Sequence, residues 1–344
     1  MGPTLRRVSA LLLMVAIAVA STATASLASS TAVAAAQTDP GRAGRAVGYM
    51  AAQQRPNGSI PAFSPIGSTA DAILAFVAAG TGRDAMLSAL GYLHAKVAAG
   101  KVSTIGLLSK VSMAVAATGR DPRKYAGHNL LREIRSTRDA HGRFGSASVL
   151  DESLAILAIE GAGAVPPPSA MAWLASAECP DGGWQFDEPY NPATDDIHCL
   201  STISPGTDFF QSDTNTTSYA VQAMEAAGSA SFAYHPFAFF RSLRDPVHGG
   251  WGYTAGFTTT DANSTSLVVQ AFASAGKRAP SGSLAALRAL QYAACGAFAY
   301  SWNGSARSGP DIGATIGAVP GLLRRPFPYI AKVKTNPPVT PPCA

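Results

Sequence analysis

The sequence has no dense cluster of basic residues and no long apolar run beyond its N-terminus, and each absence excludes a class of function. The formal net charge is +5, and it falls to +3 once a leader carrying Arg6 and Arg7 is removed. Nucleic-acid binding needs a dense basic face, so this small and scattered charge predicts no nucleic-acid partner. The apolar run from Ala10 to Ala20 is shorter than the ~20 residues of a membrane-spanning helix. No later segment is apolar and long enough, so we predict no membrane span after removal of the leader.

Residues 1–36 have the features of a secretory signal peptide. Arg6 and Arg7 precede the apolar run, and a stretch of small residues ends at Ala34-Ala35-Ala36. A positive start, an apolar core and a small-residue cleavage site are typical of such signals. We expect cleavage near Ala36, with a second possible site near Ala25, and a secreted, extracellular protein.

The chain has only four cysteines, and an even number in an exported chain predicts disulfides. Pairing Cys179 with Cys199 and Cys295 with Cys343 is the simplest arrangement, although the sequence alone permits three. Residues 326–344 form a proline-rich tail that cannot be a helix or a central strand. A disulfide would explain why this tail carries a cysteine next to its end.

An internal repeat dominates the rest of the chain. Ser212–Gly228 and Thr260–Gly276 match at nine positions without a gap, and Ser64–Gly80 fits the same frame. Ser103–Gly119 and Ala147–Gly163 fit more loosely, and Asp311 and Thr315 continue the pattern. Each unit has small polar residues that can cap a helix, an alanine-rich apolar stretch, and a glycine that can end it.

These apolar stretches predict buried inner helices, and a more polar helix precedes each of them. The predicted outer helices are 41–54, 84–98, 121–137, 169–176, 231–243 and 283–294. Six inner and six outer helices predict an all-α fold, an α6/α6 toroid over residues 37–325 with a loop insertion at about 179–211. A linear solenoid would need polar capping repeats at both ends, and the sequence has none.

Several units carry a Gly-aromatic turn between the outer and the inner helix. The turns are 180–184, 247–251, 140–144, 295–298 and 53–58. This pattern resembles the repeat of the prenyltransferase and squalene-cyclase superfamily, in which the glycine makes the turn and the aromatic residue packs the repeat on its neighbour. The resemblance covers nearly all of residues 40–325 and implies an α6/α6 toroid of the terpenoid cyclase type.

The acid of that superfamily is missing. Its protonating cyclases carry Asp-x-Asp-Asp-Thr-Ala, in which the middle Asp is the acid. The matching stretches here run from Asp213 and from Asp261, and they place Asn215 and Asn263 at the acid position. An amide has no proton of useful acidity. We therefore predict no catalytic residue.

We also predict no metal and no cofactor. The superfamily's protein prenyltransferases bind zinc, and Asp195, Asp196, His198 and Cys199 offer the ligand types locally. Catalytic zinc ligands usually come from separate elements, and in an oxidising compartment Cys199 is more simply half of a disulfide.

The candidate ligand site is the mouth formed by the 179–211 loop and the starts of the inner helices. Asp213, Asp261 and Asp311 are most simply helix caps, but several helix N-termini round one mouth would also attract an anionic group. Trp184 and Trp251 are more simply explained by packing within the repeats than by contact with a ligand. The candidate residues are Trp184, Phe186, Asp208, Phe209, Asp213, Asn215, Tyr219, Trp251, Tyr253, Asp261 and Asn263.

The sequence thus predicts an exported, non-catalytic toroid that binds a hydrophobic or anionic small molecule, or a protein partner, at this mouth. One alternative is a terpene cyclase or prenyltransferase-like enzyme with other acids, and another is a structural cell-envelope protein. The acids of the enzyme alternative would be Asp187, Glu188, Asp195, Asp196 or Asp208.

Overall fold

The computed structural model describes residues 38–145, 148–187, 199–201 and 210–343. The chain divides into two compact units, Met1–Arg42 and Ala43–Ala344. Of the first unit the described residues cover only 38–42, which begin helix α2 (Asp39–Ala52). The predicted signal peptide, residues 1–36, lies outside the described residues, and the second unit is the subject below.

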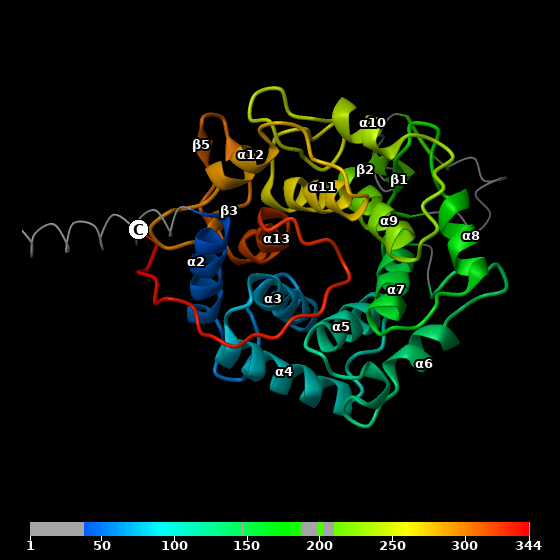
Figure 1. Cartoon of the computed structure of the whole chain (residues 1–344), viewed down its shortest axis with the longest axis horizontal. Helices are drawn as coiled ribbons and strands as arrows, with labels where there is room; N and C mark the ends of the chain where they lie inside the picture. The colour runs from blue at the N-terminus through cyan, green and yellow to red at the C-terminus, as the bar shows by residue number, and fades with distance from the viewer. Residues whose placement is uncertain (1–37, 146–147, 188–198, 202–209, 344) are drawn as a thin grey trace, which may run out of the picture. The chain divides into compact units, whose positions relative to one another are not determined.

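A closed ring of inner helices forms the centre of this unit (Figure 1). Each inner helix packs on the next, and α13 packs back on α3. The ring closes without free ends, so the unit is a double-layer barrel and not a linear solenoid, as predicted. The inner helices are α3 (Pro65–Ala79), α5 (Ile105–Ala117), α7 (Val149–Gly161), α9 (Thr214–Ala226), α11 (Ala262–Ser274) and α13 (Ile312–Leu322).

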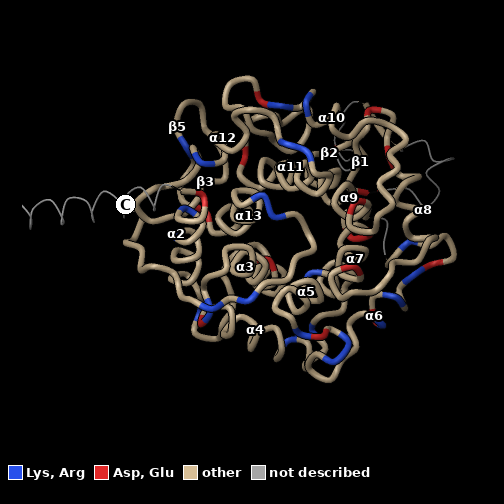
Figure 2. The backbone as a smooth tube through the Cα atoms, in the orientation of Figure 1, with Lys and Arg blue, Asp and Glu red and all other residues tan. Residues whose placement is uncertain are grey.

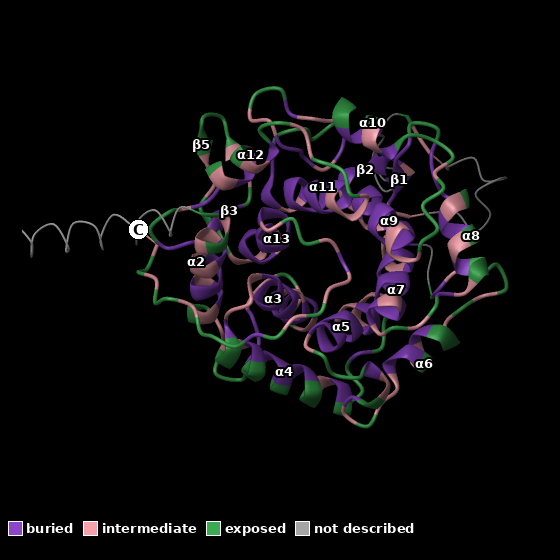
Figure 3. Ribbon diagram, viewed as in Figure 1, coloured by how far each residue is buried: buried purple, intermediate pink, exposed green. Residues whose placement is uncertain are grey.

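A second set of helices forms an outer layer, and all of them except α4 are shorter than the inner helices. They are α4 (Arg83–Ala98), α6 (Leu130–Ser136), α8 (Pro168–Ser176), α10 (Pro236–Ser242) and α12 (Ser283–Ala289), and each packs on the inner helix that carries the next lower or higher odd number. The inner helices are buried almost all round, whereas the outer ones expose one side (Figure 3). This burial explains the near-continuous apolar sequence of the inner helices.

Three predicted outer helices were too long. Residues 121–137 contain a short 3₁₀ turn (Pro122–Lys124) and α6, because Ala126 and Gly127 adopt positive φ angles of 52° and 82° that no helix allows. Residues 231–243 form a helix only from Pro236, which suits the first turn. The helix predicted over 283–294 ends at Ala289.

The polar residue before each inner helix is its N-cap, as the repeat predicts. A side-chain oxygen of the cap accepts a backbone N–H of the first turn in every inner helix. The caps are Ser64, Thr104, Ser148, Asp213, Asp261 and Asp311. Glycines with φ between 64° and 76° follow the helix ends: Gly80, Gly119, Gly163, Gly228 and Gly276. Both ends of the repeat were therefore readable from the sequence.

A hydrogen bond ties each Gly-aromatic turn to the helix that follows. In each case the backbone N–H of a large apolar residue at the end of the turn donates to a threonine hydroxyl in the first turn and a half of the helix. The pairs are Ile60 with Thr69 (2.9 Å), Trp184 with Thr217 (2.8 Å), Trp251 with Thr265 (3.0 Å) and Phe298 with Thr315 (2.9 Å). In α7 the acceptor is Glu152, whose Oε2 lies 2.6 Å from the N of Phe144. A buried carboxyl therefore replaces threonine in one repeat.

This substitution predicts a pH-dependent stability. Burial raises the pKa of the Glu152 carboxyl to about 8, although the N–H of Phe144 lowers it. The unfolded chain releases this proton near pH 4 and the folded chain near pH 8, so stability is lost as pH rises between the two. The slope reaches at most about 1.4 kcal/mol per pH unit. We expect Glu152→Gln to keep the hydrogen bond and to flatten the fall, measured by urea unfolding across this range. An unchanged slope would assign the dependence to other groups.

The two predicted disulfides are present, Cys179–Cys199 and Cys295–Cys343. Short strand pairs flank the turns. They are β1 (Trp184–Gln185) with β2 (Ser212–Asp213), β3 (Phe298–Ala299) with β6 (Pro310–Asp311), and β4 (Trp302–Asn303) with β5 (Ala306–Arg307). The β1–β2 pair holds the two ends of the predicted insertion side by side.

The C-terminal tail crosses the end of the ring at which the inner helices finish. The hydroxyl of Tyr329 donates to the carbonyl of Leu74 (2.9 Å), and the N–H of Ala331 donates to Ala117 (3.2 Å). The carbonyl of Thr335 then accepts the N–H groups of Gly82 (2.9 Å) and Arg83 (3.0 Å). The tail is thus irregular, as predicted, but it is bound across several repeats. No described helix is long and apolar enough to cross a membrane.

Candidate functional site

A central cavity of about 290 Å³ lies inside the ring of inner helices. Its wall comes from residues that the repeat places at equivalent positions, spaced four and then three residues apart on the same helix face. The first layer includes Asn215, Asn263 and Gly313, the second includes Asp71, Lys110, Tyr219, Leu267 and Gly317, and the third includes Leu74, Gln270 and Pro320. Each repeat therefore presents one face of its inner helix to the cavity.

One side of the wall carries an ion pair. Lys110 Nζ lies 2.7 Å from Asp71 Oδ2, which joins neighbouring helices α5 and α3. Burial alone would lower the pKa of the Lys110 ammonium, but Asp71 holds that pKa above its usual range. Burial also raises the pKa of the Tyr219 hydroxyl to about 12. At neutral pH the wall thus holds one cation, one anion and a neutral phenol, and its charges cancel.

The opposite side of the wall carries side-chain amides. The Oδ1 atoms of Asn215 and Asn263 and the Oε1 atom of Gln270 are buried and accept no hydrogen bond. All three residues line the cavity. Gly317 on α13 leaves the space that the Asn263 side chain occupies, because a Cβ at Gly317 would lie 2.1 Å from Asn263 Oδ1. Buried acceptors without donors are uncommon in folded proteins, and three of those among the described residues line this one cavity.

The tail forms the floor. Phe327 lines the cavity and stacks on Tyr219, with ring centroids 6.1 Å apart. Its N–H donates to Gln222 Oε1 (2.9 Å), so Gln222, the equivalent of Gln270 in the preceding repeat, is satisfied by the tail. At the other end the lining residues Ala62 and Phe63 precede α3, and Phe63 is fully exposed. The cavity therefore opens where the inner helices begin.

Of the predicted site residues, Asn215, Tyr219 and Asn263 line the cavity. Asp213 and Asp261 are buried helix caps whose oxygens accept backbone N–H groups, as in the simpler interpretation. Burial raises the pKa of Asp213 to about 7 and that of Asp261 to about 6, while hydrogen bonds from their own helices lower both. Both oxygens of Asp261 and the Oδ1 atom of Asp213 therefore accept hydrogen bonds within their own repeats, whereas Asp213 Oδ2 is buried without a donor.

The predicted aromatic residues lie elsewhere. Trp184 and Trp251 are fully buried and do not line the cavity. Each ring points toward the preceding outer helix, where its N–H donates to a backbone carbonyl, that of Leu174 (2.8 Å) for Trp184 and that of Phe240 (2.5 Å) for Trp251. They pack the repeats together. Phe186 and Tyr253 are half-buried and do not line the cavity. Asp208 and Phe209 lie outside the described residues.

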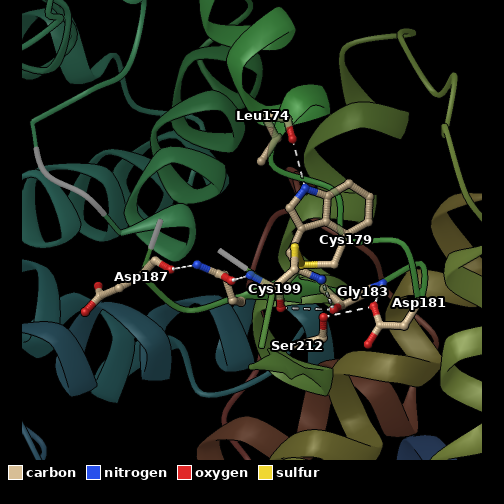
Figure 4. Close-up of a disulfide and its surroundings, with 10 residues drawn as sticks. Leu174, Cys179, Asp181, Gly183, Asp187, Cys199 and Ser212 are labelled. Carbon is tan, nitrogen blue, oxygen red and sulfur yellow. Dashed lines mark hydrogen bonds between the residues drawn. A yellow bond between two sulfur atoms is a disulfide. The ribbon is translucent and has the colours of Figure 1, made fainter. Parts of the chain in front are cut away.

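The disulfide Cys179–Cys199 fixes the described edges of the 179–211 region (Figure 4). Asp181 Oδ1 accepts the N–H of Gly183 (2.8 Å) and the hydroxyl of Ser212 (2.9 Å), and Gln185 Oε1 accepts the N–H of Cys199 (2.6 Å). Cys199 is therefore half of a disulfide. Asp195, Asp196 and His198 lie outside the described residues, and no group of three potential ligands for a metal occurs in the part that is described.

Sequence reasoning missed Asp71, Lys110 and Gln270. The signal was present, because Asp71 and Tyr219 occupy the same position of the repeat and Asn263 and Gln270 lie on one face of α11. A charged residue in an otherwise apolar inner helix must face a partner or a cavity. Comparing the residues at equivalent positions along the inner helices, and not only the caps and glycines at the helix ends, would have found these residues.

No protein-family model and no curated protein match the sequence. Solved structures do match. The α-1,6-mannanase GH76A of Salegentibacter sp. HEL1_6 superposes with a TM-score of 0.57 at 14% identity, over 83% of this chain and 98% of that one. An inactive variant of it in complex with α-1,6-mannotriose gives 0.55 at 15% identity, over 84% and 99%.

The type II terpene cyclase MstE from Scytonema, in complex with geranylgeranyl dihydroxybenzoate, gives a TM-score of 0.51 at 11% identity, over 83% of this chain and 96% of that one. The chain is an α/α toroid. This confirms the predicted fold class and its likeness to the terpene-cyclase type of barrel. Identities this low show a shared fold, and they leave the activity to be argued from the cavity.

Proposed function

We propose that this toroid is an exported protein that binds a small, uncharged ligand with several hydroxyl groups in its central cavity. The observation that carries the proposal is the set of three amide oxygens, from Asn215, Asn263 and Gln270, that line the cavity without a hydrogen-bond donor. A buried acceptor without a donor costs roughly 1–3 kcal/mol. A ligand that supplies O–H donors would remove that cost.

The charge of the wall supports an uncharged ligand. Among the described residues that line the cavity, Asp71 and Lys110 are the ionised ones, and they neutralise each other. The anionic ligand expected from the helix N-termini has less support, because the first N–H groups of the inner helices bind their own caps. The cavity volume of about 290 Å³ lies near the lower limit of common binding pockets, which favours a small ligand.

The structural neighbours and the disulfides add support. One neighbour is in complex with α-1,6-mannotriose, a hydroxyl-rich molecule, which makes a saccharide the first class to test. Two disulfides suit an oxidising, extracellular compartment, consistent with the signal-like N-terminus. A purely structural envelope protein would carry the free-energy cost of these unpaired acceptors without a ligand to offset it.

We expect Asn263→Leu to weaken saccharide binding at least about tenfold, because the variant loses a hydrogen bond to the ligand at similar side-chain volume. Mannose and α-1,6-mannobiose are suitable probes, measured by isothermal titration calorimetry. Asn303→Leu is the matched control, since Asn303 is exposed in the β4–β5 hairpin. Equal binding by both variants would reject the cavity as the site. Native mass spectrometry that finds a bound isoprenoid would reject the ligand class.

Catalysis is the second candidate, since both kinds of neighbour include enzymes. Glycoside hydrolysis generally uses two carboxyl groups. The described wall contains one, Asp71, and it is paired with Lys110. A catalytic protein would need further acids, such as Asp187 or the residues 188, 195, 196 and 208 outside the described part. The test is hydrolysis of α-1,6-mannan by the protein and by a variant with alanine at all five acids. Hydrolysis that the variant has lost would show that the protein is a hydrolase and not only a binding protein.

A further inference from the structure

Exposed aromatic side chains gather on the face of the ring at which the central cavity opens. Among the described Phe, Tyr and Trp residues, four are strongly exposed: Phe63 (105%), Phe257 (69%), Tyr300 (48%) and Tyr234 (41%). Three of them lie in segments that lead into inner helices, whereas Tyr234 lines a groove of the outer layer. We call Phe63, Phe257 and Tyr300 the entrance aromatics.

Phe63 lies at the entrance itself. It precedes Ser64, the cap of α3, and it lines the cavity together with Ala62 and Ser68. Its side chain is nevertheless fully exposed, so the protein leaves this ring uncovered. An exposed apolar ring beside a pocket costs free energy, and a ligand that covers the ring recovers it.

Tyr300 lies at the start of α11. Its carbonyl accepts the N–H of Ala262 (2.9 Å), the first residue of that helix. Burial raises the pKa of the Tyr300 hydroxyl, and the charges of Asp261 and Asp311, which cap α11 and α13, raise it further. The hydroxyl therefore lies near the first turns of both helices.

Phe257 lies in the loop before α11. The N–H of Thr214, the first residue of α9, donates to the carbonyl of Tyr253 in this loop (2.9 Å). The N–H of Phe257 then donates to the carbonyl of Thr254 (3.0 Å). A tight turn at the start of α9 therefore carries Phe257.

This side of the entrance has little charge. Helices α11 and α13 contain no Asp, Glu, Lys or Arg, and they are tan in Figure 2. The segments 56–70, 246–260 and 289–306, which carry the entrance aromatics, contain none either. The charged groups between them are the caps Asp261 and Asp311, whose carboxylates accept N–H groups of their own helices. A neutral ligand with apolar C–H faces suits such a surface.

The cavity admits only the end of a chain. Phe327 closes its far end, because it stacks on Tyr219 and donates a hydrogen bond to Gln222. A linear molecule that enters where the inner helices begin therefore stops inside. Its end unit fills the cavity, and its next unit lies beside Phe63.

We propose that the ligand is the end of a neutral oligosaccharide. The terminal unit lies in the cavity, the second unit packs a C–H face on Phe63, and later units run toward Tyr300 and Phe257. This inference rests on the proposed binding function, and it specifies the ligand as a chain and not a single sugar. Phe63 is the residue that distinguishes the two.

The test compares linear trisaccharides with their monosaccharides, by isothermal titration calorimetry on the full mature protein. The pairs are α-1,6-mannotriose with mannose, and maltotriose and cellotriose with glucose. We expect one trisaccharide to bind at least about tenfold more tightly than its monosaccharide, because apolar surface equal to roughly two methylene groups becomes buried on Phe63. Added salt should have little effect, since the chain is uncharged.

Variants locate the second unit. Phe63→Ala should weaken binding of that trisaccharide about tenfold and leave the monosaccharide unchanged, and Phe63→Trp should restore the tighter binding. The matched control is Tyr234→Ala, which removes an exposed ring far from the entrance loops in sequence and should change neither affinity. Both positions are exposed, and thermal unfolding verifies that each variant folds.

Saturation-transfer NMR identifies the unit that enters the cavity. The strongest transfer should reach a terminal unit of the trisaccharide, and Phe63→Ala should reduce transfer to the middle unit. Strongest transfer to the middle unit would contradict entry by the chain end.

The outcomes separate this inference from the binding function on which it rests. Equal affinities of every trisaccharide and its monosaccharide, or equal losses in Phe63→Ala and Tyr234→Ala, would overturn the inference. The binding function would stand in that case if Asn263→Leu still weakened the monosaccharide. Trisaccharide binding that depends on Phe63 but not on Asn263 would place the sugar on the entrance face alone and reject the cavity as the site. Absence of all saccharide binding would overturn both.

Discussion

Trp184→Ala should lower the free energy of unfolding by about 3–5 kcal/mol, the range seen when a buried tryptophan is truncated. Trp184 is fully buried, and its ring N–H satisfies the carbonyl of Leu174 on the preceding outer helix. Alanine would leave a cavity and an unpaired carbonyl at the junction of β1, α8 and α9. Denaturant unfolding followed by circular dichroism measures the loss.

Trp302→Ala is the matched control. Trp302 is half-buried at the β4–β5 hairpin, where its ring stacks on His248 with centroids 4.7 Å apart. Removing that contact should cost only about 1 kcal/mol. Equal losses in the two variants would contradict the structural role of the Gly-aromatic turn.

Replacing Cys295 and Cys343 together by serine should lower the free energy of unfolding by about 4 kcal/mol on the chain-entropy estimate. The disulfide closes a loop with a sequence separation of 48, and it ties the end of the tail to the last repeat. Reduced and oxidised protein can be compared in the same unfolding assay.

The second disulfide provides the comparison. Cys179 and Cys199 are separated by 20 residues, so their replacement should cost less, about 3 kcal/mol. A larger loss at Cys179 and Cys199 would mean that local packing round the insertion outweighs loop entropy. The order of the two values is therefore the informative result.

The fold could be predicted from the sequence because each repeat is locally complete. Asp213 caps its helix and Gly228 follows the helix end, and both signals depend on residues within one unit. The outer helices were less predictable. Positive φ angles at Ala126 and Gly127 interrupt one of them, and nothing in the local pattern requires an alanine to adopt such a conformation.

The site was only partly predictable, because it depends on which helices become neighbours. Asn215 and Asn263 were found because they occupy a position with a known role in a similar repeat. The pairing of Asp71 with Lys110 arises only when α3 and α5 lie side by side. The Phe327 floor needed the tail to fold back over the ring, and a proline-rich segment has no periodicity that predicts its path.

The tail also sets an order of events during synthesis. Thr81 and Thr335 meet although 254 residues separate them, and Tyr329 reaches Leu74 across a similar span. A nascent chain that ends at Leu323 has every inner helix and no floor. Contacts so distant in sequence form late and slowly, because a long stretch of chain must first be ordered. The central cavity therefore gains its floor in the last step of folding, after the whole barrel has been synthesised. Until then the cavity is open at both ends of the ring.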